Sequence, residues 1–184
     1  MTGIRPRPAK SYAELNREWD RLAKERHRQI ASGEDLSFEH VIVPTIWRLF
    51  EGTDRAVVLD IGSGTGDFTL QLAGVARKVI AIEPSRISMA LARGVCRTAR
   101  NVRFVEAPLE EASSSVDKGS ATAAVAVMTL MTVPDVRGFA KFCSRLEHAL
   151  SLRSLILGSG PDIGDTNRNL GFDTRWRHSW KLHL

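Results

Sequence analysis

The stretch VVLDIGSGTGDFTLQLA, residues 57–73, constrains the fold of this chain more than any other part of its sequence. An apolar run that contains one carboxylate, Asp60, leads into glycines at three alternate positions, Gly62, Gly64 and Gly66, and an amphipathic segment follows. An apolar run that does not alternate with polar residues is typical of a strand buried on both faces. Glycine costs chain entropy wherever the fold does not need it. The stretch therefore predicts a buried strand, a turn whose backbone is approached closely, and a helix.

The rest of the chain continues this alternation of strand and helix. Further apolar runs predict strands, and segments with apolar residues at helical spacing lie between them. Strict alternation implies a parallel sheet with helices on both faces and right-handed crossovers. The expected fold class is therefore α/β, a Rossmann-like, doubly wound and mostly parallel sheet. Strands are expected at 56–61, 78–83, 102–105, 121–128 and 154–157, helices from 66, at 85–99 and at 134–150, and a loop at 110–120.

Two helices are expected before the first strand. Residues 11–14, Ser-Tyr-Ala-Glu, match the capping box, in which a hydroxyl and a carboxylate satisfy free backbone N–H groups at a helix start. A second helix is expected within 38–50, with Pro44 tolerated near its start. Apolar faces are expected at Leu15, Trp19 and Leu22 in the first helix, and at Phe68, Leu72 and Val75 in the helix after the glycines.

We expect the chain to divide into three parts: a leader with N-terminal helices at 1–54, a ligand-binding core at 55–158, and a tail at 159–184. The tail contains Phe172, Trp176 and Trp180 but has no clear periodicity, and no pair of strands is predicted in it. The last predicted strand would then keep an open edge, and an open edge can pair with another chain. We therefore expect either a homo-oligomer formed through this edge or a tail that folds back over it.

Composition limits the partners and the setting of the protein. No run of 18 apolar residues is present, so no membrane span is expected. Two cysteines, Cys96 and Cys143, give neither a disulfide framework nor a metal-binding spacing, so we expect no metal and a reduced, cytoplasmic setting. The net charge is +5, but the arginines are scattered and only residues 24–28 form a basic run. Binding to nucleic acid is therefore not expected.

The glycines lie where open α/β sheets bind their ligands, at the carboxyl end of a strand and the start of a helix. Two ligand classes fit, a dinucleotide and S-adenosylmethionine. The dinucleotide fingerprint G-x-G-x-x-G would place its third glycine at position 67, where this chain has Asp67. That carboxylate would repel a pyrophosphate, whereas the methionine part of S-adenosylmethionine carries an ammonium. Glu83 at the end of the second strand can accept hydrogen bonds from ribose hydroxyls, which both ligands offer.

From about residue 57 to residue 157, the sequence resembles the class I S-adenosylmethionine-dependent methyltransferases of the small-molecule type. The stretches VVLDIGSGTGDFTLQLA and VIAIEPSRISMALAR are similar to the first two motifs of that family in order and spacing. AVAVMTLMTVPD resembles the fourth strand and the loop that borders the methyl group, and GEDLSFEHVIVPTIW resembles a lid over the cofactor. Relative to the family, the chain looks short at its C-terminus, with the last strands missing.

The resemblance implies site residues and an activity. Asp60 would help orient the methionine end of the cofactor, Glu83 would bind the ribose, and Ala107 stands where the family often has an acid near the adenine. The implied cofactor site comprises Asp60, Gly62, Ser63, Gly64, Gly66, Glu83, Pro84, Ala107 and Met128. Candidate general bases are His40 and Asp135.

The expected function is in-line methyl transfer from S-adenosylmethionine to a small-molecule acceptor. The protein would mainly supply alignment and the exclusion of water. One alternative is a catalytically inactive scaffold that binds S-adenosylmethionine or a partner protein. A second is an NAD-dependent oxidoreductase, which Asp67 disfavours.

Overall fold

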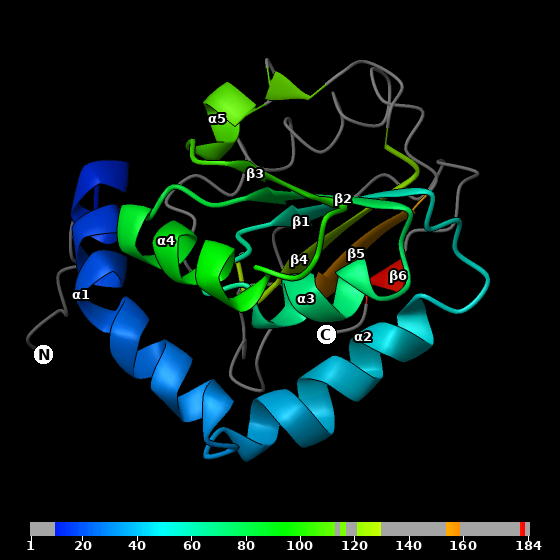
Figure 1. The fold of residues 1–184 in the computed structure, drawn as a ribbon, viewed down its shortest axis with the longest axis horizontal. Helices are drawn as coiled ribbons and strands as arrows, with labels where there is room; N and C mark the ends of the chain where they lie inside the picture. The colour runs from blue at the N-terminus through cyan, green and yellow to red at the C-terminus, as the bar shows by residue number, and fades with distance from the viewer. Residues whose placement is uncertain (1–9, 113–114, 117–120, 130–153, 159–180, 183–184) are drawn as a thin grey trace, which may run out of the picture.

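The computed structural model describes residues 10–112, 115–116, 121–129, 154–158 and 181–182. Their centre is a parallel sheet with the strand order β3-β2-β1-β4-β5-β6 (Figure 1). The predicted parallel, Rossmann-like arrangement is thereby confirmed. The strands are β1 Val57–Ile61, β2 Lys78–Ile82, β3 Val102–Val105, β4 Ala123–Val127, β5 Ser154–Gly158 and β6 Lys181–Leu182.

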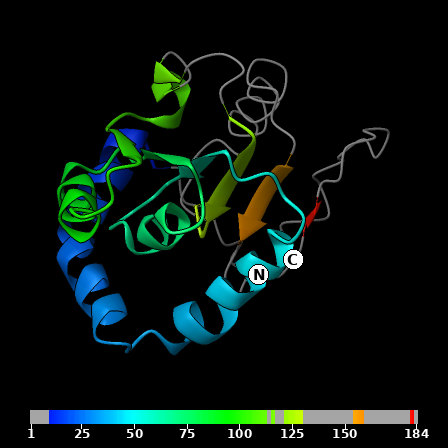
Figure 2. The same cartoon turned by 45° about the vertical axis from the view of Figure 1, so that its right-hand side comes forward.

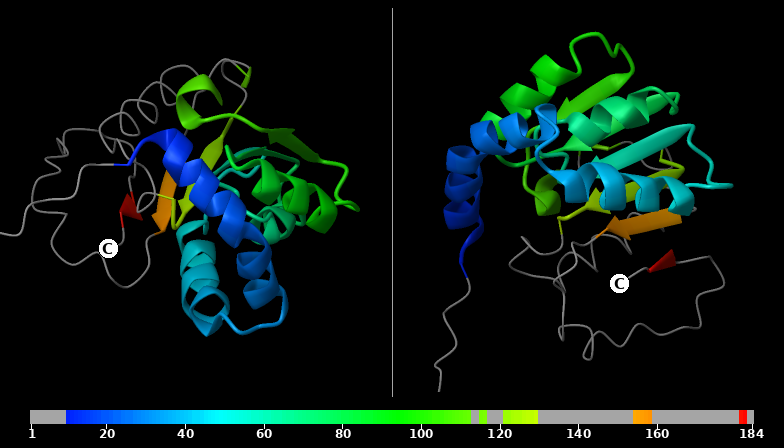
Figure 3. Two further views of the ribbon diagram at one scale, coloured as in Figure 1. Left: turned by 90° about the vertical axis from the view of Figure 1, so that its left-hand side faces the viewer. Right: turned by 90° about the horizontal axis from the view of Figure 1, so that it is seen from below.

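Helices pack on the sheet and across one of its ends. In chain order they are α1 Tyr12–Ala31, the π-helix η1 Phe38–Ile42, α2 Val43–Leu49, α3 Asp67–Ala73, α4 Arg86–Val95 and α5 Leu109–Ala112. Figure 2 and Figure 3 show that α1, η1 and α2 form a bent arm, in which α1 crosses the carboxyl ends of the strands. Because ligands of open α/β sheets bind at those ends, the path of α1 determines how the site is covered.

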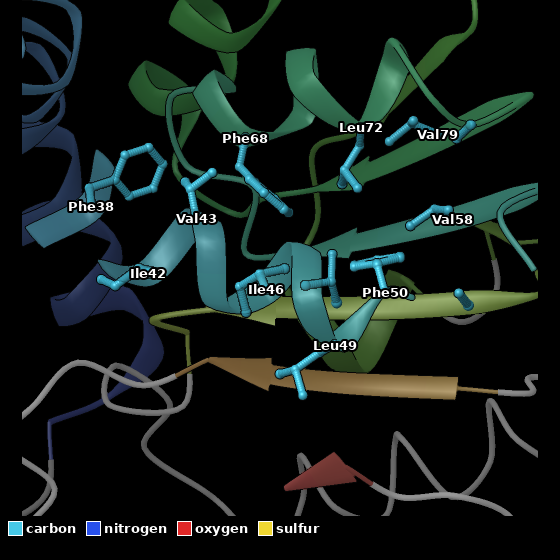
Figure 4. Close-up of a cluster of buried hydrophobic side chains, with 13 residues drawn as sticks. Phe38, Ile42, Val43, Ile46, Leu49, Phe50, Val58, Phe68, Leu72 and Val79 are labelled. Atoms are coloured by element: carbon cyan, nitrogen blue, oxygen red, sulfur yellow. The ribbon is translucent and has the colours of Figure 1, made fainter. Parts of the chain in front are cut away.

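Alternate residues of the strands serve two separate cores, as the period of two in a strand requires. On one face, side chains of β1 and β4 pack against η1, α2 and α3, and Figure 4 shows Phe50 and Ile46 at the centre of this cluster. On the other face, Leu59 and Ile80 pack toward α5 and the segment around Val116. Residues 58–59 have almost no exposed surface, so β1 is buried on both faces as predicted, and residues 79–80 of the neighbouring β2 are equally buried.

The N-terminal arm is stabilised by local hydrogen bonds. Ser11 and Glu14 form the predicted capping box at the start of α1. Asp35 accepts a hydrogen bond from the backbone N–H of Phe38 (2.9 Å) and forms an ion pair with Arg26. The guanidinium of Arg26 also lies 5.6 Å from the centre of the Phe38 ring. These contacts fix the bend between α1 and η1.

Several expectations need correction. Leu22 and Val75 were expected on packed helix faces, but they are 53% and 47% exposed. The residue of α1 that is buried is Ala23, one position beyond Leu22, and α3 ends before Val75. The expected loop at 110–120 begins as the last three residues of α5.

The expected open edge of the fifth strand is also wrong in part. β6 was not predicted, yet it pairs in parallel with Ile156 and Leu157 of β5. Part of the tail therefore lies along this edge, which corresponds to the second of the two outcomes expected from the sequence. The predicted helix at 134–150, with Cys143, and the aromatic residues Phe172, Trp176 and Trp180 lie outside the described residues.

Candidate functional site

The three glycines between β1 and α3 share one backbone conformation but have three different surroundings. Gly62, Gly64 and Gly66 all have positive φ, at +70°, +54° and +86°, a region that favours glycine. A Cβ on Gly62 would lie 2.4 Å from the hydroxyl of Thr129, and one on Gly66 would lie 2.7 Å from the Cα of Ala92 in α4. A Cβ on Gly64 would meet no atom of the described residues within 4 Å. Gly62 and Gly66 therefore allow close packing, whereas Gly64 borders open space.

The turn that carries these glycines is fixed to the neighbouring strand. The backbone N–H groups of Gly62 and Ser63 both donate to the carbonyl of Ile82, over 2.8 and 3.1 Å. The hydroxyl of Ser63 is buried and has no hydrogen-bond partner among the described residues. A buried polar group without a partner is costly, so this hydroxyl fits a site that a polar ligand completes.

Glu83 follows β2 and reaches the glycine turn. One carboxylate oxygen accepts from the backbone N–H of Gly64 (3.1 Å), and the other accepts from the backbone N–H of Ser85 (2.8 Å). The side chain is 8% exposed, and burial raises the pKa of Glu83 to about 7. The two backbone donors lower this pKa, and the charges of Asp60 and Asp20 raise it further. The geometry fixes a carboxylate at the ligand-binding end of the sheet.

Asp60 lies within β1, below the glycine turn. Its carboxylate accepts a hydrogen bond from the hydroxyl of Thr69 in α3 (2.6 Å). Burial raises the pKa of Asp60 to about 6, although the Thr69 hydroxyl counteracts this shift. Two buried acids at one end of a sheet, with few donors of their own, favour a ligand that brings donors or a positive charge.

A cavity of about 250 Å³ joins these groups. Most of the predicted cofactor residues line it, together with side chains from α1 that cover it. The predicted residues in its wall are Asp60, Gly62, Ser63, Gly64, Glu83, Pro84 and Met128. Lining residues that the predicted cofactor set did not include are Tyr12, Leu15, Asn16, Trp19, Ala23, Arg26, Ile30, Phe38, Ile61, Thr65, Asp67, Phe68, Ile82, Ser88, Val127 and Thr129. The wall combines acids on the sheet side with largely apolar and aromatic groups on the α1 side.

Three predicted residues lie outside the cavity wall, and a fourth is not among the described residues. Gly66 packs against Ala92, and Ala107 packs on the core below α5, so neither is part of the cavity wall. His40 is exposed on η1 and also lies outside the wall. Asp135 is outside the described residues. The geometry therefore gives no support to His40 as a base.

The α1 residues in the wall were missed because nothing in the sequence says which part of the sheet a preceding helix crosses. The signal available was the amphipathic spacing of Leu15 and Trp19, and both residues do line the cavity. Within the described residues, no group of three or more His, Cys, Asp or Glu side chains could hold a metal ion. The described part of the chain also contains no helix of sufficient length and apolarity to cross a membrane.

Comparisons with known proteins agree with this geometry. A family model described as a methyltransferase domain matches residues 58–149, which is half of the chain. No curated protein matches the sequence.

Solved structures share the fold. A DhpI–SAH complex is 23% identical with a TM-score of 0.57, over 74% of this chain and 62% of that one. Phosphoethanolamine N-methyltransferase 1 of Haemonchus contortus, solved with phosphoethanolamine and S-adenosylhomocysteine, is 18% identical with a TM-score of 0.63, over 75% of this chain and 29% of that one. A putative S-adenosylmethionine-dependent methyltransferase of Methanococcus maripaludis is 16% identical with a TM-score of 0.55, over 86% of this chain and 68% of that one. This chain thus spans less than two thirds of the first two structures.

Proposed function

This chain belongs to the methyltransferase domain family, and we propose that it binds S-adenosylmethionine and transfers the methyl group to a small-molecule acceptor. The observation that carries the proposal is the position of Glu83. Its buried carboxylate stands beside the open side of Gly64, at the end of a strand and within the cavity wall. A carboxylate fixed in this way can accept hydrogen bonds from the two hydroxyls of a ribose.

The residues around the glycine turn fit the rest of the cofactor. The unpartnered hydroxyl of Ser63 and the open space beside Gly64 would accommodate a polar ligand lying against the backbone. Asp60 would favour the ammonium of the methionine part, because a buried carboxylate is stabilised by a nearby positive charge. The fold neighbours described with SAH or S-adenosylhomocysteine support the same ligand.

A dinucleotide fits the same cavity less well. Asp67 begins α3 and lines the cavity at the helix N-terminus, where a pyrophosphate would have to lie. The hydroxyl of Thr65 donates to its carboxylate, which keeps the negative charge in place. Repulsion between this carboxylate and a diphosphate disfavours NAD.

Bound S-adenosylmethionine would supply the activated methyl group on its sulfonium. The chain would contribute orientation and the exclusion of water. Trp19 and Leu15 of α1 and Phe38 of η1 bring apolar surface to the cavity from the side opposite the sheet. Met128 and Thr129 follow β4 and complete the wall at the end of that strand. No base in the cavity wall is required where the acceptor is already nucleophilic.

The proposal is tested by separating binding from transfer. The protein is incubated with methyl-labelled S-adenosylmethionine and a panel of small-molecule amines, thiols and hydroxyl compounds, and label in the acceptor fraction is followed with time. Transfer to an acceptor, lost in Glu83→Ala, supports the enzyme. Binding of the cofactor without transfer to any acceptor would instead favour the inactive scaffold, and absence of binding would contradict both.

A further inference from the structure

Asp20 of α1 reaches across to the start of α4. One of its carboxylate oxygens accepts from the hydroxyl of Ser85 (2.7 Å) and from the backbone N–H of Ile87 (3.1 Å). These donors are 65 and 67 residues away along the chain. An acid at a helix N-terminus is stabilised by the free N–H groups and by the helix dipole. The contact therefore ties α1 to one defined point of the core.

Ser85 connects this contact to the proposed ribose site. Its backbone N–H donates to Glu83 (2.8 Å), while its side-chain hydroxyl donates to Asp20. The same hydroxyl oxygen accepts from the backbone N–H of Ser88 (3.1 Å) and so caps α4. Ser85 is completely buried, which leaves little freedom for either contact to move independently. A displacement of Asp20 would thus be transmitted to the turn that presents Glu83.

Apolar packing alone does not fix the position of α1. Ala23 is the one residue of this 20-residue helix that is buried. A further polar approach of α1 to the core, between Nδ1 of His27 and a carboxylate oxygen of Asp67, spans 3.8 Å, longer than a hydrogen bond. The residues one helical turn on either side of Asp20, Asn16 and Ala23, line the cavity together with Trp19. The same stretch of α1 is therefore both attached at Asp20 and exposed to the ligand.

We propose that Asp20 is a positioning residue, which places α1 over the cavity and holds the Glu83–Ser85 turn in the conformation that binds the cofactor. That the ligand of this turn is S-adenosylmethionine rests on the proposed function. Asp20 acts through Ser85 and through the placement of its helix, so its removal should loosen α1 and weaken cofactor binding together.

The pH dependence of cofactor binding distinguishes this role from a purely structural contact, because nearby charges act on the pKa of Glu83. The acids that act on Glu83 are Asp60 from β1 and Asp20 from α1, and both raise its pKa. Replacing Asp20 with asparagine keeps an acceptor for Ser85 but removes the charge. The pKa of Glu83 should then fall, and the pH at which cofactor binding is half-maximal should fall with it.

The experiment compares Asp20→Ala and Asp20→Asn with Glu25→Ala in the full chain. Glu25 is a matched control, because it lies on the same helix and its hydrogen bonds are to Arg28 and Gln29 within that helix. Amide hydrogen exchange is measured over residues 12–31, and S-adenosylhomocysteine affinity is measured from pH 6 to pH 8. In Asp20→Ala we expect exchange of α1 to rise and affinity to fall about tenfold, since a charge-assisted hydrogen bond is lost. The control should leave both unchanged.

Unchanged exchange of α1 in Asp20→Ala would overturn the proposal, and so would faster exchange with full affinity. If Asp20→Ala does not fold, Asp20→Asn decides, since it must lower the pH midpoint of binding. If the wild-type protein does not bind S-adenosylhomocysteine at all, the proposed function fails, while the exchange of α1 still tests the role of Asp20 in placing the helix.

Discussion

Replacing Gly66 and Gly64 by alanine should have opposite consequences, although the two glycines are two residues apart in one turn. Both have positive φ, so each alanine costs about 1–2 kcal/mol for a left-handed backbone. At Gly66 the new methyl would also lie 2.7 and 2.8 Å from the Cα and Cβ of Ala92 and 3.2 Å from its carbonyl oxygen. These atoms belong to the backbone and first side-chain carbon of α4, so the helix itself must shift.

Forcing an extra methyl into a packed contact costs about 1–3 kcal/mol. Gly66→Ala should therefore lower the free energy of unfolding by roughly 2–5 kcal/mol, and Gly64→Ala by about 1–2 kcal/mol, since no atom lies within 4 Å of its methyl. For a chain of this size, 1 kcal/mol corresponds to about 2–4 °C in Tm. Differential scanning calorimetry without ligand should thus give the lower Tm for Gly66→Ala.

The ligand should reverse the order. The methyl of Gly64→Ala points into open space at the cavity, so this variant should lose S-adenosylhomocysteine affinity while it remains folded, and Gly64→Val should lose more. Gly66→Ala should lose less affinity than Gly64→Ala where it is folded, because its methyl does not enter the cavity. A Gly64→Ala protein that is less stable than Gly66→Ala, or that binds with full affinity, would refute this division of roles between the glycines.

Further predictions concern Glu83. Glu83→Ala should weaken S-adenosylhomocysteine binding by about 1.5–3 kcal/mol in a calorimetric titration, as is usual for hydrogen bonds to a charged group, whereas Glu106→Ala, at an exposed acid after β3, should not. Because the pKa of Glu83 is about 7 and ribose hydroxyls bind its ionised form, affinity should rise from pH 6 to pH 8 and then level off. A pH-independent affinity would contradict this. In the ligand-free protein, stability should fall with rising pH, whereas affinity rises. The stabilisation that follows from the raised pKa of Glu83 is complete below pH 4.5 and is lost as the pH rises through about 7. Urea unfolding at pH 5 and pH 8 measures this loss.

The sheet could be predicted from the sequence because its signals are local. Apolar runs such as that around Leu59 are short and bounded by turn residues, which favours a strand over a helix, and they are buried on both faces in the parallel sheet. The two-residue strand β6 has no such pattern, and its pairing with β5 depends on the path of the tail. The exposure of Leu22 shows a further limit, since the sequence gives the amphipathic face of α1 but not the angle at which it meets the core.

The residues of the site could largely be predicted from the sequence, but the separate roles of the three glycines could not. Three glycines at alternate positions are equivalent in the sequence. The structure distinguishes them because Thr129 approaches Gly62 and Ala92 approaches Gly66, whereas in the described part of the chain no neighbour approaches Gly64. Both neighbours come from distant segments. Asp20 gave no sequence signal either, because its partner Ser85 is 65 residues away.

The central claim, that Glu83 and the glycine turn form an S-adenosylmethionine site and not a dinucleotide site, is tested most directly by isothermal titration calorimetry of the unmodified protein. Samples are titrated with S-adenosylmethionine, S-adenosylhomocysteine and NAD at pH 8, where Glu83 is ionised. We expect S-adenosylmethionine and S-adenosylhomocysteine each to bind with one molecule per chain. NAD should bind at least about tenfold more weakly, a difference in binding free energy of about 1.4 kcal/mol. Tight binding of NAD with no binding of S-adenosylmethionine would contradict the account.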